Sequence, residues 1–145
     1  MTELGYDDRS IDFSTTNTVL FSTATAALVG GLEVPVVGTG AAVEVEFFAP
    51  QVKHTANLPV STYLVVNGAV DSATGQYRNW DTAQKAGGSM SRRLVLTNGV
   101  SYTFQVGVST ASGIATVCGF VTGGPGSGGS GGPVSAGVMY LRVAA

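Results

Sequence analysis

The clearest pattern in this chain is an alternation of apolar and charged residues over positions 42–50. A period of two is typical of a half-buried antiparallel strand, because successive side chains point to opposite faces. One face would carry Val43, Val45 and Phe47, and the other Glu44, Glu46 and Phe48. The run reaches Pro50, where we expect the strand to stop, because proline cannot donate to a sheet ladder.

Similar patterns return along the chain, and no helical periodicity competes with them. Asn67-Gly68 and Asn98-Gly99 are tight-turn signals, since both residue types tolerate positive φ. The second signal predicts a hairpin between residues 90–96 and 101–109, and Pro35 predicts an edge strand. The expected strands are residues 18–23, 32–37, 42–49, 60–66, 90–96, 101–109, 113–121 and 137–143.

These segments predict an all-β domain of about eight to nine antiparallel strands in a two-sheet β-sandwich. Between the strands we expect a polar loop at residues 50–58, which holds Lys53 and His54. Residues 69–89 are polar and are expected to be irregular.

Three regions depart from the sandwich pattern. Residues 1–16 carry little periodicity but hold four of the nine acids, so we expect an N-terminal acidic arm before a single domain at 17–145. Residues 123–133 are glycine, serine and proline and predict a flexible loop. The last strand is apolar on both faces except at Arg142, which predicts a central strand covered by its own domain and by a neighbouring subunit.

Composition narrows the classes of function. Only 11% of residues are charged, which suggests that other subunits cover part of the surface. The net charge of −2 gives no broad basic field for nucleic acid or an acidic membrane. No apolar run approaches the roughly 18 residues of a membrane span, and the polar N-terminus is unlike a signal peptide, so we expect synthesis in a cytoplasm. Cys118 is the single cysteine and is expected to be a small buried hydrophobe.

Three segments carry a resemblance to a known group: residues 32–36 with 42–47, residues 94–106, and residues 139–143. In them the chain resembles the small jelly-roll domains of virion proteins from tailed phages of actinobacteria. Those domains are related in shape to the tumour-necrosis-factor and complement-head trimers. The resemblance implies a jelly roll that forms a homotrimer with its C-terminal strand near the threefold axis. Its interface residues would be Met139, Tyr140, Leu141 and Val143.

Candidate chemistry is sparse. His54, the only histidine, is expected on the surface, although a threefold axis could gather three copies around a metal. Arg92 and Arg93 are adjacent on a strand and point to opposite faces, so they form no basic patch. The best ligand-binding candidate is a segment whose aromatic and polar side chains suit a sugar or a protein: Tyr77, Arg78 and Trp80.

No catalytic set or cofactor motif is visible, so we expect a protein that is not an enzyme and has no cofactor. A metal enzyme on this fold would need several histidine and carboxylate ligands. The glycine-rich segment lacks the lysine and following helix of a phosphate loop.

Two interpretations remain, both in the virion. The first is a trimeric capsid decoration (minor capsid) protein that docks on the major capsid protein. Docking would use the acidic arm: Glu3, Tyr6, Asp7, Asp8, Ile11, Asp12 and Phe13. The second is a tail-tip or fibre adhesin, a partner of other tail proteins, that binds glycans of the host surface.

Overall fold

The computed structural model describes residues 2–18, 28–56, 58–77, 86–119, 121–122, 133–135 and 138–145. Within these ranges the chain is all-β, with no helix. The strands are β1 (Glu3–Arg9), β2 (Phe13–Thr15), β3 (Leu28–Val37), β4 (Ala42–His54), β5 (Val60–Val66), β6 (Ala69–Tyr77), β7 (Ala86–Val95), β8 (Ser101–Thr110), β9 (Ala115–Cys118), β10 (Val121–Thr122), β11 (Pro133–Ser135) and β12 (Met139–Ala144).

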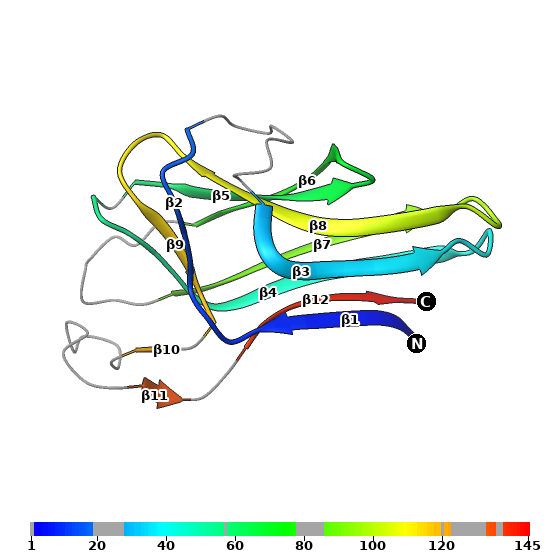
Figure 1. Ribbon diagram of the computed structural model, residues 1–145, viewed down its shortest axis with the longest axis horizontal. Coiled ribbons are helices and arrows are strands. Elements are labelled where there is room, and N and C mark those ends of the chain that lie inside the picture. The colour runs from blue at the N-terminus through cyan, green and yellow to red at the C-terminus, as the bar shows by residue number, and fades with distance from the viewer. Residues whose placement is uncertain are drawn as a thin grey trace.

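Two antiparallel sheets pack face to face, as Figure 1 shows. Sheet A has the order β1-β12-β4-β9-β2, with β7 paired to β4, and sheet B has the order β3-β8-β5-β6. β10 and β11 form a separate short pair. The expected fold, a two-sheet antiparallel sandwich of jelly-roll type, is confirmed.

The inner faces of the two sheets form one hydrophobic core. Sheet A contributes Val45, Phe47 and Leu141, all at most 2% exposed. Sheet B contributes fully buried Leu64 and Phe104. The alternation that predicted the inward set over residues 42–48 is therefore confirmed.

The strand that begins at Ala42 is longer than expected. β4 continues through Pro50 to His54, so the polar loop expected at residues 50–58 is wrong in its first half. The pairing of β4 with β7 is irregular between Ala49 and Val52. A bulge at this point frees the ladder from needing a backbone N–H at Pro50, so the strand bends and does not end.

One of the two Asn-Gly turns behaves as predicted. Asn67 and Gly68 have φ of 50° and 77° and join β5 to β6, as both central residues of a type I′ hairpin require. At the second turn only Gly99 has positive φ, and β7 and β8 lie in different sheets. The predicted hairpin is therefore wrong: residues 96–100 carry the chain from sheet A to sheet B.

Other boundaries also differ from expectation. Residues 69–89 were expected to be irregular, but β6 occupies Ala69–Tyr77 and β7 begins at Ala86. Pro35 lies in β3, which is at the edge of sheet B as predicted. The strand expected at 18–23 and the glycine-rich loop at 123–133 fall almost wholly outside the described residues.

The acidic N-terminal segment is not an arm apart from the domain. β1 pairs with β12 from Glu3↔Ala144 to Arg9↔Met139, and β2 pairs with β9. The backbones of Thr2 and Ala145 also bond to each other in both directions. Figure 1 shows both termini at the same end of the sandwich. Low side-chain periodicity concealed these strands, because one of their faces is polar.

Side chains join the two sheets along both open sides of the sandwich. On one side, Asp7 of β1 accepts a hydrogen bond from the backbone N–H of Glu33 in β3, at 3.1 Å. Arg9 donates to the Gly30 carbonyl of the same edge strand. On the other side, Arg92 of β7 pairs with Asp71 of β6 at 2.8 Å. The two contacts on the first side satisfy backbone groups of β3, at the edge of sheet B, that would otherwise be open to other chains.

Candidate functional site

The candidate site is the outer face of sheet A, where aromatic and charged side chains of neighbouring strands contact one another. Strand alternation turns Val45, Phe47 and Leu141 into the core and places their neighbours outside. Cross-strand register then aligns the outward residues in rows, since directly opposed residues share a face. One row contains Asp8, Tyr140 and Phe48, and the next contains Tyr6, Arg142 and Glu46.

Three aromatic rings, taken from both of these register rows, form an aromatic row of their own across β1, β12 and β4. The ring centroids of Tyr6 and Tyr140 are 5.8 Å apart, and those of Tyr140 and Phe48 are 5.6 Å apart. These separations fall within the range of attractive aromatic pairs. Tyr6 is 44% exposed, and Tyr140 and Phe48 are half-buried, so the row presents apolar surface to solvent.

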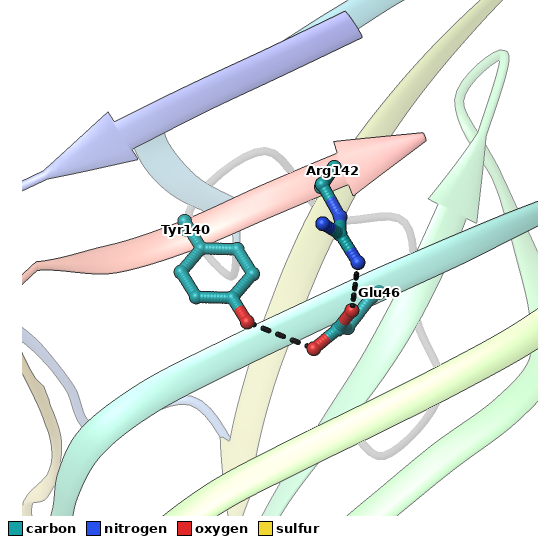
Figure 2. A network of polar contacts seen from close by, with 3 residues as sticks. All are labelled: Glu46, Tyr140 and Arg142. Atoms are coloured by element: carbon teal, nitrogen blue, oxygen red, sulfur yellow. Dashed lines mark hydrogen bonds and ion pairs between the residues drawn. The ribbon is translucent and has the colours of Figure 1, made fainter. Parts of the chain in front are cut away.

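A single carboxylate fixes the middle of this row. Glu46 accepts a hydrogen bond from the Tyr140 hydroxyl at 2.8 Å and pairs with Arg142 at 2.9 Å, using a different oxygen for each (Figure 2). β12 supplies two of these side chains and β4 the third. The contacts hold the Tyr140 ring in one orientation, so the surface is ordered before any partner arrives.

The electrostatics of the row agree with this geometry. The pKa of Tyr140 is raised, chiefly by burial and then by its hydrogen bond to Glu46. Burial also raises the pKa of Tyr6, with a further contribution from the charge of Asp8. Both phenols therefore stay neutral through the physiological range and serve as hydrogen-bonding, partly apolar surface.

The residues predicted for the trimer interface divide between the two faces of β12. Met139, Leu141 and Val143 are 0% exposed and pack in the domain's own core, so their assignment to an interface is wrong. Tyr140 alone of the four lies on the outer face. The strand is central, as predicted, and lies between β1 and β4 of the same chain. Cover of its outer face by a neighbouring subunit stays a prediction.

The residues predicted for a docking arm also divide. Asp7 bonds to β3, Asp12 Oδ1 accepts from the Gly119 N–H at 3.1 Å, and Phe13 packs against the core. These three are engaged within the domain. The members that remain exposed are Glu3, Tyr6, Asp8 and Ile11.

Arg9, which the sequence showed only as the one base of the acidic segment, organises the corner between β1 and β2. Its guanidinium donates to the carbonyls of Ile11 at 2.8 Å and Asp12 at 3.0 Å and lies 5.7 Å from the centre of the Phe13 ring. Backbone contacts of this kind have no sequence pattern that could have revealed them.

His54 is buried and not on the surface as expected. Its Nε2 lies 2.6 Å from the Ser112 carbonyl, and its Nδ1 accepts from the Ala56 N–H at 2.8 Å. Since the Ser112 oxygen can only accept, Nε2 carries the proton. A metal at His54 would have to displace one of these bonds. Nowhere in the described ranges do three or more His, Cys, Asp or Glu side chains gather as a metal site requires.

The predicted ligand segment cannot be placed in the same way. Tyr77 is the last residue of β6, and Arg78 and Trp80 lie outside the described residues. Cys118 is buried, as predicted. The described part of the chain contains no helix of the length and hydropathy that a membrane crossing requires.

Comparison with known proteins gives only distant likenesses. No family model matches the chain, and no curated protein matches its sequence. Among solved structures, the Eiger tumour necrosis factor of S. frugiperda has 12% identity and a TM-score of 0.46, covering 100% of this chain and 94% of that one. A family 35 carbohydrate-binding module from Clostridium thermocellum has 14% identity and a TM-score of 0.43, covering 99% and 98%.

A third similar structure is the family 35 carbohydrate-binding module of Cellvibrio japonicus Abf62, at 12% identity and a TM-score of 0.39, covering 97% of this chain and 91% of that one. Likeness at this level says nothing about function. The site must therefore be interpreted from its own residues.

Proposed function

We propose that this protein is a non-enzymatic structural protein of a phage virion, which forms a homotrimer and decorates the capsid. The observation that carries the assembly is the ordered aromatic row of Tyr6, Tyr140 and Phe48 on the outer face of sheet A. Aromatic side chains are enriched at protein interfaces, and ordering them in advance lowers the entropy cost of association. The virion and the number of subunits rest on the resemblance of the sequence to phage jelly-roll domains.

The low charge of the chain supports the same proposal. With 11% charged residues, a monomer in solution has little protection against nonspecific association, and a defined contact between subunits would cover part of that weakly charged surface. A stable contact of this kind would bury more than about 1,000 Å² between subunits. Attachment to the major capsid protein would then use the exposed residues of the N-terminal segment that the trimer leaves free, with Ile11, 70% exposed, as an apolar anchor.

The assembly is tested by sedimentation equilibrium of the purified protein at micromolar concentration. We expect a single species of three times the chain mass, and a shift towards monomer for Tyr6→Ser combined with Phe48→Ser. A wild-type protein that sediments only as monomer contradicts the proposal. Electron microscopy of particles labelled on this protein then separates a capsid location from a tail location.

Glycan binding by a tail adhesin is the second candidate. Sugars stack on an open aromatic face, but Tyr140 is flanked by Tyr6 and Phe48 on its two sides. The row therefore suits another protein better than a sugar ring. The adhesin interpretation depends on Tyr77, Arg78 and Trp80, and a glycan array comparing the wild type with Trp80→Ala tests it directly.

A further inference from the structure

We propose that the trimer is a head-to-tail ring, in which the β1 edge of sheet A in one copy packs on the β7 edge of sheet A in the next. The occupant of each edge is thus a second copy of this chain. The inference rests on the proposed assembly through sheet A and adds its arrangement. Two differences between the edges support it: the sign of their charge and the match of their apolar residues.

The β1 edge is acidic and partly apolar. Asp8 is exposed and belongs to the outward row with Tyr140. Leu4 and Tyr6 of the same strand are 38% and 44% exposed, so they place apolar surface beside these charges. Glu3 adds a second exposed carboxylate at the start of the strand.

The β7 edge is basic and partly apolar. The Arg93 side chain is 71% exposed and lies 3.6 Å from Glu44 of its own sheet, which is too long for a hydrogen bond, so most of the guanidinium remains in solvent. Val95, two residues further along the same face, is 73% exposed. This edge therefore presents a cation beside an apolar side chain, the counterpart of the acids beside Leu4 and Tyr6.

Symmetry decides between the possible pairings. A twofold contact through one edge would bring the acidic edge against a second acidic edge, or the basic edge against a second basic edge, and juxtaposed like charges are costly at interfaces. A head-to-tail contact places acid opposite base and apolar opposite apolar at every junction. Repetition of such a contact closes a ring when the rotation permits.

Charge reversal with rescue tests the arrangement. We expect Asp8→Arg and Arg93→Glu each to weaken assembly at least tenfold, because the change is repeated at each junction, and the double variant to recover most of the wild-type affinity. Glu33→Arg is the control matched to Asp8→Arg: it makes the same change of net charge at an exposed residue of sheet B and should leave assembly unchanged. Sedimentation velocity gives the dissociation constants, and circular dichroism shows that each variant is folded.

The possible outcomes separate the two proposals. If each single variant assembles at least tenfold more weakly and the double variant recovers most of the wild-type affinity, the result supports the ring. An assembled wild type whose affinity neither reversal changes, or a double variant in which the two losses of affinity simply add, overturns the contact between the β1 and β7 edges but leaves the proposed trimer standing. A monomeric wild type overturns both.

Discussion

Arg92 Nε lies 2.8 Å from Asp71 Oδ1, and this ion pair joins β7 at one edge of sheet A to β6 at the edge of sheet B. The side chains are 40% and 20% exposed, so water screens the pair only in part. Arg92 lies on the inward face of β7, opposite Val45, which directs it across the opening between the sheets. The pair therefore stabilises the packing of two sheets and not of one.

A double-mutant cycle measures this contact. We expect Arg92→Met and Asp71→Asn each to lower the free energy of unfolding, with a coupling energy of about 1 kcal/mol between them. Urea unfolding of all four proteins at one fixed concentration gives the values, since assembly shifts apparent stability by mass action. Additive effects of the two substitutions would show that the pair contributes nothing.

Gly5 tests whether the N-terminal segment belongs to the domain. A Cβ at this position would overlap Val34 Cγ1 of β3. Gly5→Ala is therefore expected to lower stability by about 1–3 kcal/mol, the usual cost of overpacking. In a Val34→Ala background the same substitution should cost much less. If Gly5→Ala has no effect on the urea midpoint in either background, β1 does not pack on β3 as described.

The structure predicts different effects on stability for the same Asn→Val substitution in the two Asn-Gly turns. Asn67→Val should lower stability by about 1–2 kcal/mol, because a β-branched residue resists the φ of 50° found there. Its amide also bonds to the backbone of Thr103, at 2.8 Å, so part of the loss is that bond. Asn67→Asp keeps the acceptor and the tolerance of positive φ and should be nearly neutral.

Asn98→Val is the matched control, because Asn98 does not have positive φ. Thermal unfolding followed by circular dichroism should give a Tm close to that of the wild type. A loss equal to that of Asn67→Val would mean that the two turns have the same geometry, contrary to the structure.

Alkaline pH should loosen the outer face of sheet A. Because the folded-state pKa of Tyr140 is raised, its contribution to stability is complete below the unfolded value of about 10 and is lost as the pH rises through the folded value, which lies higher. Tyr140→Phe should therefore make stability fall less steeply above pH 10.

Tyr102→Phe provides the control for this pH dependence. Hydrogen bonding with Thr97, first with its side chain and then with its backbone N–H at 3.0 Å, lowers the pKa of the Tyr102 phenol, so its linkage has the opposite sign. Removing it should not flatten the alkaline loss. Stability measured from pH 8 to 11 in both variants decides the point.

The features that could be predicted from the sequence are those set by residues that are neighbours in the chain. The inward and outward sets of β4 and the Asn67-Gly68 turn depend on neighbouring residues and were found. The partner of each strand depends on residues far away: Tyr6 meets Tyr140 only because β1 pairs with β12. His54 looked like a loop residue because its partner Ser112 is distant in sequence.

The candidate site was visible in parts. Glu46 and Phe48 were assigned correctly to the outer face, and Arg142 was the one polar residue noticed in the last strand. Their combination with Tyr6 was missed because the acidic residues around it suggested a segment separate from the domain. Exposed apolar residues on a strand with a polar inward face do not show the usual alternation, so the sequence of β1 did not predict a strand.

The paired backbones of Thr2 and Ala145 make the chain nearly circular. A short glycine linker between its two ends would turn β1 and β12 into a hairpin without moving either strand. New ends could then be opened at Asn67-Gly68, a solvent-facing turn, to give a circular permutant with the same sheets. Refolding of that permutant to the same circular dichroism spectrum would show that the pairing of β1 with β12 depends on their side chains and backbones and not on the order of the strands along the chain.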